Sequence, residues 1–223
     1  MPANSILDSG SIPFQTEGRL LQELGLRLVA SPEVALLELI KNAYDADSAS
    51  CEVSLADKDS TVIIKDVGHG MTIHDFRSKW MRIATSSKIN QQFSPKYKRR
   101  LTGAKGIGRF AVRYLGDHLT IDSVAYDDQR GCTTRLTAKF DWLELDDAQN
   151  IEDAKVKYEL VRVDDATPTG TTLVVKKLKS TTEFTKNQVS GQICCASCRR
   201  SVDWSAANFP TLWLVQKMIL DFR

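Results

Sequence analysis

The feature that most constrains the fold is a long polar segment in the middle of the chain, residues 83–105. This segment is rich in basic residues and shows no helical or strand periodicity, so it offers little to a hydrophobic core. Connections of about twenty residues inside a compact domain are uncommon and are usually functional lids or disordered segments. We therefore expect a core built from the sequence on either side, with residues 83–105 at the surface.

A helix is predicted to begin at Pro32. Ser31 is a typical N-cap residue, and proline is favoured in the first turn because its missing N–H is not needed there. The apolar residues that follow recur at helical spacing and predict one buried face. That face consists of Val34, Leu37, Ile40 and Ala43. Residues 17–29 carry a weaker helical pattern, which Gly18 and Gly25 interrupt.

Other segments show strand or helix patterns. Residues 51–56 and 61–66 predict two strands joined by a turn. Thr72 and Asp75 have the spacing of a capping box, which predicts a helix ending near Met81. A further helix is predicted after the polar segment, followed by four strands. These elements cover residues 106–116, 118–125, 132–140, 155–163 and 171–178.

Composition limits the class of protein. The chain has 223 residues, of which 42% are hydrophobic and 26% are charged. These values are typical of a globular domain and exclude disordered, collagen-like and coiled-coil chains. No apolar run approaches the roughly 18 residues that a membrane-spanning helix needs, and the first residues lack the pattern of a secretory signal. We therefore expect a cytoplasmic protein that does not bind a membrane.

Five unevenly placed cysteines predict reduced thiols and not a disulfide framework. Cys194, Cys195 and Cys198 form a cluster near the end of the sequence. A structural zinc site needs four ligands, and the three histidines of the chain lie far upstream. A zinc site is therefore less favoured than a local accident of composition.

The charge of the chain is strongly asymmetric. No acidic residue lies between Asp75 and Asp117, whereas eleven basic residues do, and the formal net charge of +2 thus leaves −9 for the remainder. Two interpretations of this basic segment remain open: a solvated surface loop and a contact with a polyanion. The eleven residues are Arg77, Lys79, Arg82, Lys88, Lys96, Lys98, Arg99, Arg100, Lys105, Arg109 and Arg113.

Three oxygen-bearing side chains share one face of the helix that begins at Pro32. Glu38, Asn42 and Asp45 stand at positions i, i+4 and i+7. An amide oxygen is a neutral hard ligand suited to a magnesium ion that also binds phosphates. A carboxylate one turn away can orient or deprotonate a water molecule. The alternative is an ordinary amphipathic helix with a solvated polar face.

A glycine-containing loop follows the strand predicted at residues 61–66. Asp66, Gly68 and Gly70 alternate in this loop, and Met71 comes next. A carboxylate at a strand end can accept a hydrogen bond from an exocyclic amine. Glycines allow close approach of the backbone to a flat ring, and methionine packs against aromatic faces. The alternative is a simple glycine turn.

A second glycine-containing segment precedes the helix predicted at residues 106–116. It contains Gly103, Gly106 and Gly108. Glycines at the start of a helix free backbone N–H groups to bind an anion, and the helix dipole favours a phosphate there. The pattern is neither a Walker A loop nor the GxGxxG order of a dinucleotide-binding fold. The alternative is a flexible lid hinge.

Taken in order, four segments resemble the GHKL ATPase superfamily, whose members include heat-shock chaperone ATPases, type II topoisomerases, MutL-type repair proteins, MORC proteins and histidine kinases. The segments are ELIKNAYDADS, DVGHGMT, TGAKGIGRF and GTTLVVKKL, within residues 14–178. Each is a weak signal alone, but a chance match of all four in this order and spacing is far rarer than a match of any one.

The resemblance implies an α/β fold of the Bergerat type, a two-layer α+β sandwich with a mixed β-sheet, helices on one face and a long basic lid. ATP with Mg2+ would bind between the helices and the sheet. The implied organisation is an N-terminal strap at residues 1–16, an ATP-binding domain at 17–178 with its lid at 83–105, and a C-terminal tail at 179–223.

The resemblance also implies roles for individual residues. Glu38 would be the general base, Asn42 the magnesium ligand and Asp66 the residue that binds the adenine amine, with Thr171 supporting the adenine site through its hydroxyl. The other implied nucleotide contacts are Asp45, Ala46, Gly68, Gly70, Met71, Lys88, Gly103, Lys105, Gly106, Ile107, Gly108, Arg109 and Phe110.

The branch is indicated by shorter matches. FQTE at residues 14–17 resembles the chaperone ATPases, and IATSSK at residues 83–88 resembles MutL and MORC proteins. A histidine kinase is disfavoured because none of the three histidines lies on a candidate dimerisation helix before the ATPase region. These switch ATPases normally continue into a second domain that supplies a cation to the γ-phosphate, whereas about 45 residues follow residue 178 here.

The expected function is therefore a Mg2+-dependent ATP-binding domain with slow hydrolysis. It would act as a conformational switch through lid closure, dimerise on nucleotide binding, and work with a protein partner or further domain. Two alternatives remain open. One is a nucleotide-binding module that does not hydrolyse ATP and acts in a larger assembly. The other is a nucleic-acid-binding protein that uses the basic segment as its phosphate contact.

Overall fold

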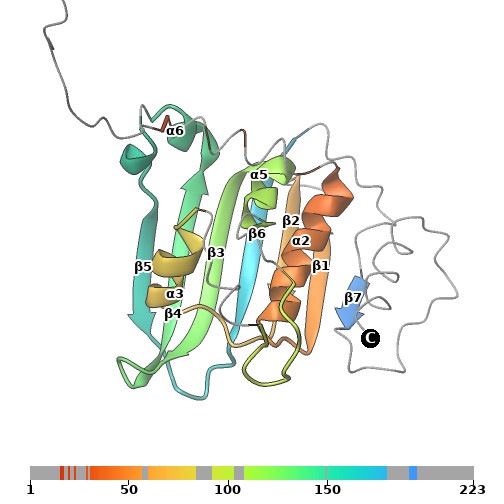
Figure 1. Cartoon of the computed structure of the whole chain (residues 1–223), viewed down its shortest axis with the longest axis vertical. Coiled ribbons are helices and arrows are strands. Elements are labelled where there is room, and N and C mark those ends of the chain that lie inside the picture. Colours follow the sequence, from red (N-terminus) through yellow and green to blue (C-terminus); the bar gives the residue numbers. More distant parts are fainter. Residues whose placement is uncertain are drawn as a thin grey trace, which may run out of the picture.

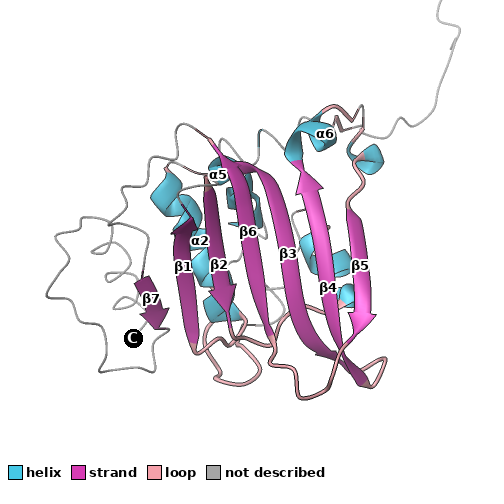
Figure 2. Cartoon of the chain, turned by 180° about the vertical axis from the view of Figure 1, so that it is seen from behind, coloured by secondary structure: helices cyan, strands magenta, loops and turns pink. Residues whose placement is uncertain are grey.

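The protein is built of two layers, one β-sheet and a set of helices packed on one of its faces (Figure 1). The view from behind shows the opposite face of the sheet, which the labelled helices do not cover (Figure 2). The computed structural model describes residues 16–17, 20, 23, 29, 31–56, 60–83, 92–102, 108–148, 150–179 and 191–194. The two-layer α/β fold predicted from the sequence is confirmed.

The sheet has seven strands in the order β5-β4-β3-β6-β2-β1-β7. All six strands predicted from the sequence are present. The smallest, β7, pairs with the outer edge of β1, and no pattern in the sequence predicted it. The bounds are β1 (Ser50–Ala56), β2 (Thr61–Asp66), β3 (Gly116–Asp127), β4 (Cys132–Asp141), β5 (Lys157–Arg162), β6 (Gly170–Leu178) and β7 (Gly191–Cys194).

The expectation of a mixed sheet is wrong, because every pair of neighbouring strands described here is antiparallel. The reason lies in the position of β6, which is inserted between β2 and β3 and runs antiparallel to both. The helical connection from β2 to β3 thus joins two strands of the same direction that are not neighbours. A parallel pair would have formed only if these two strands had been adjacent.

Helix α2 (Pro32–Asp45) begins as predicted, with the Ser31 hydroxyl accepting a hydrogen bond from the Val34 N–H at 3.4 Å. Of the predicted buried face, only Ala43 is nearly inaccessible. Ala35, Leu39 and Ala43, four residues apart, are nearly inaccessible, whereas Val34, Leu37 and Ile40 are only partly buried. Small alanine side chains at two of the three positions allow the helix to lie close to its neighbours, which selects the i+4 row for the interface.

The remaining helices are short. The capping box of Thr72 and Asp75 is present and opens α3 (Ile73–Asp75), which continues as a π-helical segment (Phe76–Trp80) in place of the α-helix expected there. A 3-10 turn (Gly108–Phe110) leads into α5 (Ala111–Leu115), and α6 (Trp142–Asp146) follows β4. An ion pair between the buried Arg113 and Asp146 links α5 to α6.

The hydrophobic core lies between the helices and the sheet. Leu39 and Leu115 from the helices are almost fully buried, as are strand residues Leu119, Ile121 and Leu136. Burying one such side chain contributes about 1.5–3 kcal/mol relative to leaving it in water. The core therefore fixes α2 and α5 on the sheet, and these two helices position the candidate site.

In the described part of the loop expected at residues 83–105, no helix or named strand forms, but the second half follows a defined path. Residues 92–102, here called the lid hairpin, fold back on themselves through a bridge between Phe93 and Arg100. The N–H of Ser94 donates to the carbonyl of Arg99 at 2.8 Å. Residues 84–91 and 103–107 lie outside the described part of the chain.

Thr16, the last residue of the predicted N-terminal strap, contacts the region after α6, where the N–H of Ile151 donates to the carbonyl of Thr16 at 3.0 Å. Most of the helix predicted at residues 17–29 lies outside the described residues, although Leu20 and Glu23 are helical. Among the described residues, no helix is both long enough and apolar enough to span a membrane.

Candidate functional site

Asp66 stands at the end of β2 with its carboxylate held in a fixed orientation. Its Oδ1 accepts hydrogen bonds from the N–H groups of Gly68 at 2.8 Å and Thr171 at 3.3 Å. Burial raises the pKa of Asp66, and these two hydrogen bonds oppose that rise. A half-buried carboxylate whose second oxygen has no hydrogen-bond partner among the described residues is well suited to accept a hydrogen bond from a ligand amine.

The loop after Asp66 can follow its path only because of its glycines. A Cβ on Gly68 would lie 2.5 Å from the carbonyl oxygen of Ala46. Gly70 has a φ of +70°, and a Cβ there would lie 1.9 Å from the carbonyl oxygen of Val124. The loop is therefore packed directly against the C-terminal end of α2, where the His69 N–H donates to the Ala46 carbonyl at 3.0 Å.

The hydroxyls of Ser48, Ser123 and Thr169, which no sequence pattern singled out, fix the same loop together with that of Thr171. The Met71 N–H donates to Ser123 Oγ at 2.9 Å, and this oxygen lies 2.8 Å from Thr171 Oγ1. Thr169 Oγ1 donates to the Gly68 carbonyl at 2.8 Å, and Ser48 Oγ accepts from the Val67 N–H at 2.8 Å. These groups set the geometry around Asp66 by holding the backbone.

Two of these hydroxyl-bearing residues stand at sequence positions that could have identified them. Ser123 lies on the core-facing side of β3, on the same face as Leu119 and Ile121, and it is fully buried. Ser48 belongs to the ELIKNAYDADS segment and is also fully buried. A buried serine on an otherwise apolar face needs a hydrogen-bond partner, which points to a structural task.

Glu38 and Asn42 lie one turn apart on α2, as predicted. Glu38 Oε1 forms an ion pair with Lys41 Nζ at 2.8 Å. A Cβ on Gly108 would lie 2.7 Å from Glu38 Oε2, so the segment that leads into α5 passes directly over this carboxylate. The glutamate therefore faces the part of the chain that the sequence assigns to phosphate binding.

The side-chain amide of Asn42 has a buried nitrogen with no hydrogen-bond partner in the described part of the chain. Buried polar groups are almost always satisfied, so this NH2 group calls for a hydrogen-bond acceptor such as a phosphate oxygen or water. Among the described residues, no cluster of three or more His, Cys, Asp or Glu side chains could hold a metal ion. The fit of Asn42 to Mg2+ rests on its amide oxygen, a neutral hard ligand of the kind that this ion accepts when phosphates and water complete its shell.

The next two carboxylates of this segment hold the lid hairpin. Asp45 Oδ1 accepts from the N–H and the hydroxyl of Thr102 at 3.0 and 3.1 Å. Asp47 accepts from the Ser94 hydroxyl at 2.5 Å and from the N–H groups of Lys96 at 2.7 Å and Tyr97 at 3.1 Å. Burial alone would raise the pKa of Asp47, but these hydrogen bonds outweigh burial and lower it below 3.8.

The implied phosphate contacts are described only in part. Gly108 is placed over Glu38, and Phe110 is buried in the core. For Arg109 only the backbone is described. The other implied contacts lie outside the described residues and stay predictions; they are Lys88, Gly103, Lys105, Gly106 and Ile107. Cys195 and Cys198 also lie outside this part, while the backbone of Cys194 is in β7.

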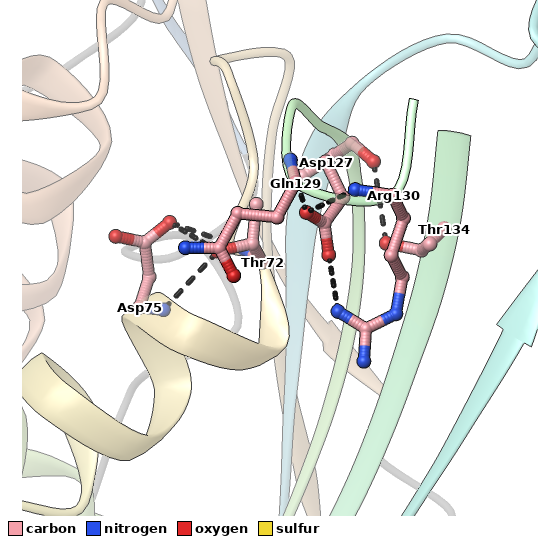
Figure 3. A network of polar contacts seen from close by, with 7 residues as sticks. Thr72, Asp75, Asp127, Gln129, Arg130 and Thr134 are labelled. Atoms are coloured by element: carbon pink, nitrogen blue, oxygen red, sulfur yellow. Dashed lines mark hydrogen bonds and ion pairs between the residues drawn. The ribbon is translucent and has the colours of Figure 1, made fainter. Parts of the chain in front are cut away.

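The segment that follows the glycine loop is also fixed by polar contacts. The Thr72 hydroxyl donates to Asp75 Oδ2 at 2.8 Å and accepts from the Asp75 N–H at 3.1 Å (Figure 3). The same view contains the β3–β4 turn, in which Asp127 accepts from Arg130 Nη1 at 2.9 Å. Because the start of α3 is capped, the chain leaves Met71 in one defined direction.

Comparison with known proteins agrees with this geometry. Over 76 residues, the chain is 37% identical to a protein of Herpetosiphon aurantiacus that is provisionally named type II restriction enzyme HgiDII. The similarity covers 34% of this chain and 12% of that relative. A family match is broader, since residues 30–171, or 142 of the 223, match the family described as "Histidine kinase-, DNA gyrase B-, and HSP90-like ATPase". The chain therefore belongs to this GHKL-type ATPase family and carries its ATP-binding domain.

Proposed function

We propose that this chain is a Mg2+-dependent ATP-binding domain that hydrolyses ATP slowly and acts as a nucleotide-driven switch. The observation that carries the proposal is the placement of two backbone segments along α2. Gly108 lies over Glu38, and Gly68 lies over Ala46. Eight residues of helix separate these two points by about 12 Å. A nucleoside triphosphate can span this distance with its base beside Asp66 and its terminal phosphate beside Glu38.

In this orientation each residue has a defined task. Asp66 accepts a hydrogen bond from the adenine amine, and Thr171 and Ser123 hold the loop that presents it. Mg2+ bound by Asn42 and the phosphates would neutralise charge on the phosphate oxygens. Glu38 orients a water molecule toward the terminal phosphate, and Lys41 holds the glutamate side chain in place.

Slow turnover is expected because charge that develops on a transferred phosphoryl group needs a positioned cation. The lid residues Lys105 and Arg109 are candidates within the chain, and a further domain or partner is the alternative source. We place the chain nearer the chaperone, MutL and MORC branch than the histidine kinases, and we propose that ATP binding closes the lid and promotes dimerisation. The restriction activity named for the Herpetosiphon protein is not carried over, because the aligned segment is 12% of that protein.

Single-turnover hydrolysis of ATP by the 223-residue chain tests the proposal. We expect measurable but slow release of phosphate, and a loss of about 100-fold or more in Glu38→Gln, the usual contribution of a general base. Glu33→Gln on the same helix is the matched control and should hydrolyse at the wild-type rate. Equal rates for Glu38→Gln and wild type would place the base elsewhere. Binding without any hydrolysis would instead support the non-hydrolysing module.

A further inference from the structure

The lid hairpin carries positive charge on a fixed backbone at the surface. Lys96, Lys98 and Arg100 are exposed, and within the described residues none of the three has a carboxylate partner. The nearest acidic positions along the sequence are Asp75 and Asp117, far outside the hairpin. Asp45 and Asp47 contact the hairpin, but neither forms an ion pair with these three side chains, whose charges are therefore unpaired within the described structure.

The backbone of the hairpin is held by the last residue of α2 and by the turn that follows it, in addition to its own hydrogen bonds. Asp47 binds the Ser94 hydroxyl and two N–H groups at the tip, and Asp45 binds Thr102 at the base. Both anchors are carboxylates, and hydrogen bonds to charged groups are worth about 1.5–3 kcal/mol each. A surface element held in this way loses less conformational entropy on binding a partner than a free loop does.

The cations of the hairpin divide into one structural residue and three presented residues. Arg99 is 9% exposed, donates to the Ser48 carbonyl at 2.7 Å, and lies over the rings of Tyr44 and Tyr97 at 4.8 and 4.6 Å. Its charge is therefore used to pack the hairpin against α2. Lys98 has a φ of +53°, a conformation that glycine or asparagine adopts with less strain, yet the position carries a charged side chain.

ATP phosphates do not account for the three presented cations. The hairpin is attached at Asp45 and Asp47, next to the glycine loop at Ala46, and Figure 1 shows it beside this end of α2. The proposed phosphate end is at Glu38, about 12 Å back along the helix from Ala46. Under the proposed orientation of the nucleotide, the hairpin lies at the adenine end.

We propose that the lid hairpin binds the sugar–phosphate backbone of duplex DNA through Lys96, Lys98 and Arg100, without reading the base sequence. Duplex DNA is a regular polyanion with one negative charge per roughly 1.7 Å of helix axis, which complements cations held on a fixed backbone. Base stacking needs aromatic faces, and the Tyr97 ring is already occupied by Arg99 and by Lys96, whose Nζ lies 4.9 Å from its centroid. The hairpin also carries Phe93, which is 52% exposed. A single strand is therefore the alternative outcome of the test, and a labelled single strand that binds more tightly than the duplex would overturn the proposal.

Fluorescence anisotropy with a labelled duplex, measured without nucleotide over a series of salt concentrations, tests the proposal on the full chain. The test variant is Lys96→Gln/Lys98→Gln/Arg100→Gln. Removing three phosphate contacts should lower the slope of log K against log salt by about 2.7, because each contact contributes roughly 0.9. Its affinity at low salt should fall by at least about tenfold.

The matched control is Lys139→Gln/Lys157→Gln/Lys176→Gln, which removes the same charge from exposed strand positions outside the hairpin. This control should keep the wild-type slope, and Lys96→Arg/Lys98→Arg should bind like wild type. Equal loss in the test variant and the control would overturn the proposal, since net charge alone would then explain it. Competition by polyglutamate as effective as by unlabelled duplex of equal charge would also overturn it in favour of an acidic protein partner. Thermal unfolding of every variant verifies folding, and the readout does not depend on ATP binding.

Discussion

Replacement of Asp66 by asparagine is the sharpest perturbation of the proposed adenine site. Asparagine keeps the size of the side chain and one oxygen acceptor. That oxygen can still receive the Gly68 N–H at 2.8 Å and the Thr171 N–H at 3.3 Å, so the loop is expected to keep its path. The other oxygen becomes an NH2 group, and the adenine amine then meets a donor where it met an acceptor. Asp66→Asn therefore isolates recognition from folding.

The size of the effect follows from the hydrogen bond that is lost. A hydrogen bond to a charged group contributes about 1.5–3 kcal/mol, and each 1.4 kcal/mol corresponds to a tenfold change in affinity. The Kd for ATP should thus rise by about 10- to 100-fold. The Kd for inosine triphosphate, which has an oxygen in place of the amine, should change much less. The preference for ATP over inosine triphosphate should therefore shrink in Asp66→Asn.

Calorimetric titration of both nucleotides into both proteins measures this double difference. Asp122→Asn, an exposed carboxylate on the helix-free face of the sheet, is the matched control and should bind both nucleotides like wild type. A folded Asp66→Asn protein with unchanged affinity for ATP would refute the assignment of the adenine site. An equal loss for ATP and inosine triphosphate would show that the loop had moved and that the amine is not recognised there.

The same residue predicts a dependence of stability on pH in the absence of nucleotide. Burial raises the pKa of Asp66 above 3.8 in the folded protein, so the folded state binds the proton more tightly than the unfolded state. The free energy of unfolding of wild type should consequently fall as pH rises from 3.8 through the raised pKa. Asp66→Asn does not titrate, so its stability relative to wild type should increase over this window. A difference in unfolding free energy that is constant with pH would contradict the buried carboxylate.

The remaining predictions concern α2 and the hairpin. Asp47→Ala should destabilise the protein by about 2–3 kcal/mol and increase hydrogen exchange of the hairpin amides, because three donors lose a charged acceptor; unchanged protection would show that the hairpin stands alone. Asn42→Ala should remove the dependence of ATP affinity on Mg2+, and a retained dependence measured by calorimetry would place the metal ligand elsewhere. Lys41→Met should lower the single-turnover rate without weakening ATP binding, Lys41→Arg should restore the rate, and a change in affinity alone would exclude a role in positioning Glu38.

Most helices and strands of the fold could be predicted from local patterns in the sequence. The N-cap at Ser31 and the capping box of Thr72 and Asp75 are decided by residues three positions apart, and both are present as predicted. The strands were predictable because their alternation of apolar and polar residues reflects one buried face. The buried row of α2 was not predictable with the same accuracy, since which of its apolar rows faces the sheet depends on the neighbouring α5.

The lid hairpin shows why the rest was missed. Residues 92–102 have no alternation that predicts a hairpin, because their order depends on Asp45 and Asp47 on another element. The direction of the strands was missed for a related reason: β6 enters the sheet between two earlier strands, and no local pattern reports that insertion. At the candidate site, the chemistry of Glu38 and Asp66 was visible in the sequence, whereas the hydroxyls that orient the loop act across the fold.

The central claim is that this chain binds ATP between Asp66 and Glu38 with Mg2+ on Asn42. Equilibrium titration of the 223-residue chain with a non-hydrolysable ATP analogue, with and without Mg2+, tests it most directly. We predict one binding site per chain whose affinity falls when Mg2+ is removed by a chelator. The absence of any binding up to about 1 mM analogue, the upper end of the usual range for enzyme substrates, would contradict it.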